Sequence, residues 1–252
     1  MARRKLIPLL QHSIDAPWGA IRFCEAAKPS ELDLALAHSI ASILDSAIRV
    51  KGSASLAVSG GKSPIDMFAA LSNAKLDWSK VLVTLVDDRW LPSNHPDSNE
   101  ALVKKYLLSN AASAASFIGL CSASATPEEG LDSVRARLSR LPSVIDITII
   151  GMGNDGHTAS LFPCSIEAST GLDPACPHSV IAVHPKSAPY PRISMSLPRI
   201  VSTTALFLHI VGDEKKRVLE AALRDEKTRS PIVQVLAAAG DVATVYWCPS
   251  NA

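Results

Sequence analysis

Four short apolar runs, each rich in β-branched residues, constrain the fold of this sequence more than any other feature. They lie at residues 55–58, 81–86, 145–150 and 205–211. A strand with one solvent-exposed face alternates between apolar and polar residues, whereas a strand that helices cover on both faces is apolar almost throughout. The runs therefore predict buried, parallel strands in the middle layer of a layered protein.

Stretches with the apolar spacing of helices separate these predicted strands. The first spans about residues 29–52, and the others lie at 64–71, 97–108, 127–141 and 213–223. Residues 117–120 predict one further short strand. Because strands and helices alternate along most of the chain, we expect an α/β protein with a doubly wound, mostly parallel sheet flanked by helices, as in Rossmann-like folds.

Length and composition narrow the classes of protein. A chain of 252 residues can build one large core, so we expect a single domain over residues 1–252 with an irregular tail at 1–18. The net charge of +1 offers no field for a nucleic acid or an anionic membrane. No apolar stretch reaches the roughly 18 residues of a membrane span. Five cysteines without a C-x-x-C pair predict neither a disulfide framework nor a zinc site, which fits a cytoplasmic protein.

The loop after the first run predicts a phosphate site, because ligands of doubly wound sheets bind beyond the carboxyl ends of the strands. It reads Ser59-Gly60-Gly61-Lys62-Ser63-Pro64. The glycines let the backbone approach a ligand, and Lys62 and Ser63 can add an ammonium and a hydroxyl donor. An ordinary glycine turn with a serine cap is the alternative. Leu56 stands where a P-loop requires glycine, so we exclude that motif.

The loop after the third run carries a carboxylate and an imidazole. Its start, Gly151-Met152-Gly153-Asn154-Asp155-Gly156-His157, matches the dinucleotide pattern G-x-G-x-x-G. Pro163 leaves only a short helix, and Asp155 and His157 crowd the pyrophosphate position, so we expect no nicotinamide cofactor. His157 is the strongest candidate for a general base, since imidazole accepts a proton near neutral pH. Alternatively, Asp155 caps a helix that begins near an exposed His157.

Two carboxylates and a guanidinium, Asp87, Asp88 and Arg89, follow the second run. Arg89 can pair with an anion or with a developing oxyanion, although a local ion pair beside a packed tryptophan has the same composition. Asp97 and Ser98 are expected helix caps. The remaining histidines lack metal-binding spacing, so we assign no metal.

Together, the three loops resemble those of the 6-phosphogluconolactonase family in order and spacing, from about residue 55 to 163. The most specific part is Thr158-Ala159-Ser160-Leu161-Phe162-Pro163, since the related glucosamine-6-phosphate deaminases share only the preceding half of that loop. The likeness continues more weakly through Arg192-Ile193-Ser194, Gly212-Asp213-Glu214-Lys215 and Asp241. Lys62 and Asp88 depart from the family pattern, which usually has Ser and Glu there.

The resemblance implies a glucosamine-6-phosphate deaminase-like fold. It also implies hydrolysis of 6-phospho-D-glucono-1,5-lactone to 6-phospho-D-gluconate, the second step of the oxidative pentose phosphate pathway. Metal ions and organic cofactors have no part in that reaction. The expected partner is a small-molecule phosphosugar lactone, and we expect a monomer or a homodimer.

The same resemblance implies roles for the residues. His157 would activate water, Asp155 would orient or support the imidazole, and Arg89 would stabilise the oxyanion or the phosphate. The residues expected to bind the substrate and its phosphate are Ser59, Gly60, Gly61, Lys62, Ser63, Asp87, Arg192 and Lys215, with Lys216 as an alternative to Lys215.

Two other functions stay open at this point. An aldose–ketose isomerase or deaminase would use Asp87 for carbon-acid chemistry above the same phosphate site. A sugar-phosphate sensor would bind the ligand without turnover, because fold alone does not decide function. The presence of both Asp155 and His157 argues against the sensor.

Overall fold

The computed structural model describes residues 9–225 and 230–250. A large sheet contains the strands β1 (Leu10–Ala16), β2 (Gly19–Glu25), β3 (Ala54–Val58), β4 (Val81–Leu85), β6 (Ser116–Ile118), β7 (Ile145–Ile150), β10 (Thr203–Val211) and β11 (Ala243–Cys248). Their order is β1-β2-β11-β10-β7-β3-β4-β6. The β1–β2 hairpin is antiparallel, and the other neighbouring pairs are parallel. The α/β class and the mostly parallel sheet are thus confirmed.

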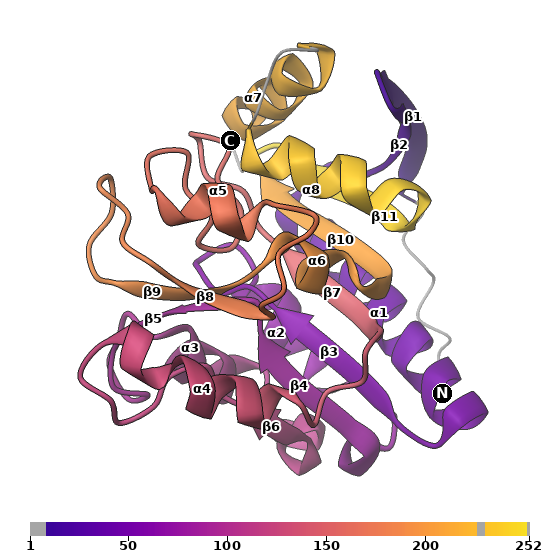
Figure 1. The fold of residues 1–252 in the computed structure, drawn as a ribbon. Helices are drawn as coiled ribbons and strands as arrows, with labels where there is room; N and C mark the ends of the chain where they lie inside the picture. Colours follow the sequence, from indigo (N-terminus) through magenta and orange to yellow (C-terminus); the bar gives the residue numbers. More distant parts are fainter. Residues whose placement is uncertain (1–8, 226–229, 251–252) are drawn as a thin grey trace.

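Helices cover both faces of this sheet, with α1 behind it and α6 and α8 in front of it in Figure 1. The α-helices are α1 (Pro29–Lys51), α2 (Ile65–Leu71), α3 (Asn99–Tyr106), α4 (Pro127–Leu138), α5 (Glu167–Gly171), α6 (Leu197–Val201), α7 (Asp213–Arg224) and α8 (Pro231–Ala239). Short 3₁₀ helices span Trp78–Lys80, Asn110–Ala114 and Gly240–Val242.

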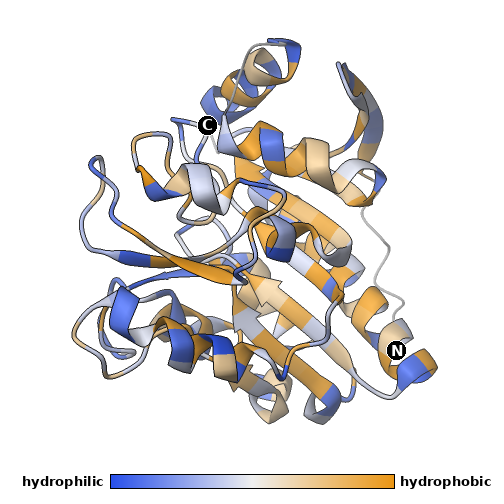
Figure 2. Cartoon of the chain, viewed as in Figure 1, coloured by the Kyte–Doolittle hydropathy of each residue, from blue (hydrophilic) through white to orange (hydrophobic). Residues whose placement is uncertain are grey.

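Burial explains why the apolar runs form the inner strands. Every residue of β3, β7 and β11 is buried, and the visible parts of β3 and β7 are mostly orange in Figure 2. On α1, Leu32, Leu36, Ile40 and Leu44 recur at helical spacing and are fully buried. The helix ends at Lys51, and the Gly52 that caps it has a φ of 80°, which glycine adopts without strain. Two-sided packing therefore holds the central strands in place.

A second sheet of three antiparallel strands lies beside the first. Its order is β5 (Asp87–Arg89), β9 (Arg192–Met195) and β8 (Val180–Val183). The chain enters it directly from β4, because Val86 bonds through its backbone to both Val58 and Met195. The acidic loop expected after the second run is therefore a short strand, which pairing with β9 makes possible.

The reversal of strand order between β3 and β7 sets the position of the functional loops. After β3 the chain adds β4 and β6 on one side, and then it returns to place β7, β10 and β11 on the other. At such a switch point the two following loops diverge and leave a crevice. The loops that begin at Ser59 and at Gly151 flank this crevice.

The predicted helices and strands are confirmed, with small shifts at their ends, and the expected tail at 1–18 is wrong in its second half. Residues 10–16 form β1, which pairs with β2 at the edge of the sheet, and residues 1–8 lie outside the described part. Hydrogen bonds to β2 hold this polar, mostly exposed strand. Its pattern therefore gave no apolar signal.

A buried carboxylate joins the two strands that flank the switch point. Asp146 on β7 accepts hydrogen bonds from the backbone N and the Oγ of Ser55 on β3, at 2.8 and 2.9 Å, and pairs with Lys51 Nζ at 2.5 Å. We predict that Asp146→Ala lowers the free energy of unfolding by about 2–4 kcal/mol, because it leaves the two donors of Ser55 buried without an acceptor. Urea denaturation measures the loss. Asp132→Ala, which removes an exposed helix pair with Arg135, is the control and should change stability by less than about 1 kcal/mol. Equal effects would contradict the prediction.

Candidate active site

A cavity of about 250 Å³ opens at the switch point. All of the predicted substrate-binding residues line it, together with Arg89 and His157. Asp155 does not line the cavity and instead contacts His157 from behind. The structure therefore brings the residues of three separated loops to one place.

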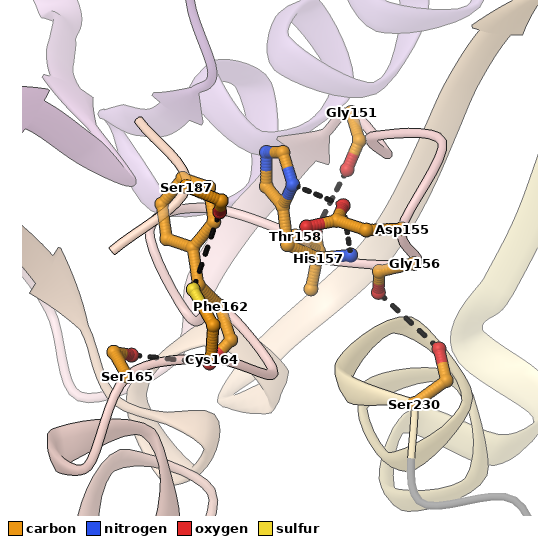
Figure 3. Close-up of polar contacts among 10 residues, drawn as sticks. All are labelled: Gly151, Asp155, Gly156, His157, Thr158, Phe162, Cys164, Ser165, Ser187 and Ser230. Carbon is orange, nitrogen blue, oxygen red and sulfur yellow. Dashed lines mark hydrogen bonds and ion pairs between the residues drawn. The ribbon is translucent and has the colours of Figure 1, made fainter. Parts of the chain in front are cut away.

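The Asp155 carboxylate holds the His157 imidazole. Nδ1 of His157 lies 2.5 Å from Oδ1 of Asp155, and the same oxygen accepts the backbone N–H of His157 at 3.2 Å (Figure 3). A carboxylate at Nδ1 favours the tautomer with the proton on that nitrogen, which leaves the Nε2 lone pair free to accept a proton. The helix-cap alternative for Asp155 is wrong, since the next helix, α5, begins only at Glu167.

Packing fixes the plane of this imidazole. The His157 ring stacks on Phe162, with 4.1 Å between centroids and 26° between planes. A Cβ at position 153 would lie 2.2 Å from Cε1 of His157, so only glycine fits there. The ring is thus pre-positioned before any ligand arrives.

Contacts from outside the loop hold its backbone. The Thr158 hydroxyl donates to the Gly151 carbonyl at 2.8 Å. At the start of α8, Ser230 Oγ and the backbone N of Ile232 both donate to the Gly156 carbonyl, at 3.2 and 3.0 Å. Figure 3 shows Ser230 reaching Gly156 from α8. Gly156 has a φ of 77°, a conformation that favours glycine. The loop that carries Asp155 and His157 is therefore held by hydrogen bonds at the end of β7 and at the start of α8.

Two arginines meet in the small sheet. Arg89 on β5 and Arg192 on β9 are directly opposite in register, and Arg89 donates through Nη1 to the Asp97 carbonyl. The Arg192 guanidinium lies 5.5 Å from the centroid of Phe162. Burial lowers the pKa of Arg192. Like charges placed opposite each other in a sheet repel. An anion bound between Arg89 and Arg192 would therefore reduce the repulsion between their guanidinium groups.

Asp87 is a buried acceptor next to these arginines. Its Oδ2 accepts the Ser160 hydroxyl at 2.6 Å, and its carbonyl accepts Asn99 Nδ2 at 2.9 Å. Asn99 also explains the first glycine of the loop after β3, since a Cβ at Gly60 would lie 2.0 Å from Asn99 Oδ1. The second glycine, Gly61, has a φ of 96°. Both glycines are therefore required by geometry.

The structure separates the two candidate lysines of α7. Lys215 lines the cavity, and it forms no ion pair within residues 9–225 and 230–250. Burial lowers its pKa. Lys216 instead pairs with Glu25, and its Nζ lies 3.9 Å from the centroid of the Trp247 ring. Only Lys215 is placed to meet a ligand.

Asp88, the departure from the family pattern, caps a helix. This fully buried carboxylate accepts the backbone N–H groups of Arg89, Asn99 and Glu100, at 2.8, 2.7 and 3.0 Å, and the Ser98 hydroxyl at 3.2 Å. Ser98 is the N-cap of α3, as predicted. Asp97 does not cap, because its carbonyl and its carboxylate bind Arg89 and Tyr190. The second carboxylate thus orients α3 and the strand that carries Arg89.

Asn99, Ala159 and His209 are among the cavity residues for which the sequence predicted no role in the site. Ala159 has a φ of 49°, a left-handed conformation that cannot be predicted from the sequence because alanine does not favour it. His209 interrupts an apolar run, which was a signal for a functional group in a buried strand. No cluster of three or more His, Cys, Asp and Glu side chains suited to a metal ion occurs in the part of the chain that the structure describes. Within that same part, no helix has both the length and the apolar character to cross a membrane.

Fold and site together define a class: α/β enzymes of small phosphorylated metabolites, with a carboxylate–imidazole pair at the rim of a cationic cavity. The family model described as glucosamine-6-phosphate isomerases/6-phosphogluconolactonase matches residues 27–247. The chain belongs to this family.

Individual relatives agree with the family match. The chain is 42% identical to a 6-phosphogluconolactonase of Mesorhizobium japonicum, over 87% of this chain and 92% of that protein. It is 38% identical to one of Pseudomonas putida, over 91% and 94%. The crystal structure of a 6-phosphogluconolactonase from Shewanella baltica superposes with a TM-score of 0.86 at 39% identity, over 90% of this chain and 97% of that one. The expected deaminase-like fold is thereby confirmed.

The buried Asp88 gives stability a pH dependence that can be measured. Burial, the largest cause, raises its pKa from 3.8 to about 6, against the lowering effect of the three backbone N–H groups. Because the folded state holds the proton more tightly than the unfolded chain, this contribution is complete below pH 3.8 and is lost as the pH rises through about 6. Relative to Asp88→Asn, wild type should lose up to about 3 kcal/mol of unfolding free energy between pH 4 and 7, by urea denaturation. A difference that stays constant with pH would contradict this.

Proposed function

We propose that the protein hydrolyses 6-phospho-D-glucono-1,5-lactone to 6-phospho-D-gluconate in the oxidative pentose phosphate pathway. The observation that carries this proposal is the Asp155–His157 pair at the edge of a cavity with four cationic side chains, Lys62, Arg89, Arg192 and Lys215. Relatives named 6-phosphogluconolactonase over nearly the whole chain support it. The five free thiols suit a reducing compartment such as the cytoplasm.

In this reaction His157 acts as general base and then as general acid. Nε2 takes a proton from water while the water oxygen attacks the lactone carbonyl carbon, and the carbonyl oxygen becomes an oxyanion. The intermediate then breaks the bond between the carbonyl carbon and the ring oxygen, which receives the proton from the imidazolium. Asp155 stabilises the imidazolium between the two steps.

Different cationic side chains of the cavity neutralise the two negative charges of the reaction, one on the oxyanion and one on the phosphate. Arg89 enters the cavity from the small sheet, and its guanidinium stabilises the oxyanion through charge-assisted hydrogen bonds. The phosphate is held by the glycine loop and the remaining donors, namely Ser59, Gly60, Gly61, Lys62, Ser63, Arg192 and Lys215. Ser59 Oγ is buried without a hydrogen-bond partner in the described chain, as expected of a donor that awaits a ligand.

The direct assay follows lactone disappearance. Glucose 6-phosphate and a dehydrogenase generate the lactone in place, and the spontaneous hydrolysis is subtracted at each pH. Acceleration by the protein supports the proposal, and the absence of acceleration would refute it. Turnover of glucosamine 6-phosphate in a parallel assay would point to the isomerase or deaminase alternative.

We predict that His157→Ala lowers kcat by about 10²- to 10⁴-fold, the usual contribution of a positioned base, with little change in phosphate affinity. Asp155→Asn should lower kcat in the same direction, because an amide no longer favours the imidazolium. His178→Ala, which alters an exposed histidine outside the cavity, should leave kcat unchanged. An active His157→Ala protein would remove this residue from the mechanism.

The two lysines of α7 offer a matched pair for the phosphate site. Lys215→Ala should raise KM about tenfold or more with a smaller effect on kcat, since the lost interaction is a charge-assisted contact to the phosphate. Lys216→Ala removes the same charge one residue further on and should leave KM unchanged. Steady-state kinetics of both variants measure the two KM values. If Lys215→Ala and Lys216→Ala have the same KM, Lys215 does not hold the phosphate.

A further inference from the structure

A buried histidine that the proposed reaction does not use lies in the cavity wall. His209 is on β10, next to the catalytic strand β7, and its residue surface is 4% exposed. It lines the same cavity as His157 and Lys215. Its neighbours along β10, Leu208 and Ile210, are fully buried apolar residues. An imidazole at this buried position is unusual, because a buried polar group is unfavourable unless it has a partner.

Both ring nitrogens of His209 are buried polar atoms. Neither Nδ1 nor Nε2 of His209 has a hydrogen-bond partner among the described residues. Buried polar groups without partners cost about 1–3 kcal/mol each, and structures retain them where a ligand, water or catalysis makes use of them. Because His209 lines the cavity, a ligand bound there can supply a hydrogen-bond partner.

A carboxylate lies close to one ring nitrogen. Asp33 on α1 is 4% exposed, and its Oδ1 lies 3.3 Å from His209 Nε2. Asp33 is absent from the cavity wall, so the imidazole stands between this carboxylate and the ligand space. Negative charge at Nε2 favours a proton on that atom. The other nitrogen, Nδ1, then carries the lone pair.

We propose that His209, oriented by Asp33, accepts a hydrogen bond from a hydroxyl group of the bound sugar and so selects polyhydroxylated phosphosugars. The inference rests on the proposed function and adds a specificity-determining residue to it. A lone pair accepts from a hydroxyl but repels a phosphate oxygen, which the cations of the cavity hold instead. A site built to bind a hydroxyl discriminates strongly against analogues that lack it, because its own polar group is then left unpaired.

The test compares lactones that differ by one hydroxyl. The parent lactone and its 2-deoxy, 3-deoxy and 4-deoxy analogues are hydrolysed by wild type and by His209→Phe. We expect the variant to lose about tenfold or more in kcat/KM on the parent lactone. The loss should shrink to within about twofold on the one analogue that lacks the contacted hydroxyl. Equal losses on all four lactones, or no loss on the parent, would overturn the proposal.

Tyr246→Phe is the matched control. Tyr246 faces His209 across the β10–β11 register, and its hydroxyl donates to Ser39 on the same helix that carries Asp33. It does not line the cavity, so its loss should leave kcat/KM unchanged on every lactone. Asp33→Asn should reproduce part of the effect of His209→Phe with the same dependence on the hydroxyl.

Two binding measurements separate this proposal from its alternatives. Inhibition by inorganic phosphate should be the same in wild type and His209→Phe, whereas weaker inhibition in the variant would assign His209 to the phosphate and overturn the hydroxyl contact. Calorimetry with 6-phospho-D-gluconate tests the contact without turnover, and the variant should bind about tenfold more weakly. If wild type binds this product but hydrolyses no lactone, the proposed function fails on its own. If His209→Phe fails to fold, Asp33→Asn gives the same comparison.

Discussion

The reversal of strand order between β3 and β7 is the constraint on which the rest of the structure depends. Parallel strands end at the same edge, so the loops after β3 and β7 would run side by side in a singly wound sheet. Here the chain leaves β3 in one direction and β7 in the other, and the divergence opens the cavity. Asp146 bonds across these two strands below the opening. The loops that begin at Ser59 and at Gly151 thus acquire fixed positions from the sheet itself.

Around this crevice, the molecule keeps charged groups in arrangements that are unfavourable without a ligand. Arg89 and Arg192 face each other in the small sheet, and burial opposes the charge on Arg192 and Lys215. Residues outside the cavity, such as Asp88 at the start of α3, hold the elements that carry them. Preorganised charge of this kind needs little rearrangement when an anion or an oxyanion forms, which is how such sites lower barriers.

The sequence predicted the large sheet and most of the site because both leave local signals. Continuous apolar runs mark strands buried on two faces, and the loop motifs alone predict that His157 and Arg89 lie at strand ends. Local sequence patterns predicted less where a residue's contacts lie far away in the sequence. Nothing local to Asp87 predicts that it pairs with Ser194 in a second sheet, or that Asp33 on α1 lies beside His209 on β10. The polar strand β1 likewise forms through its pairing with β2 rather than through its own pattern.

The orientation of the sugar phosphate in the cavity can be measured in a crystal structure with 6-phospho-D-gluconate bound. We expect the phosphate at Gly60-Gly61 and Lys215. We expect the carboxylate, which derives from the lactone carbonyl, within hydrogen-bond distance of His157 Nε2. A product that binds in the opposite direction, or outside this cavity, would show that His157 does not act on the lactone carbon.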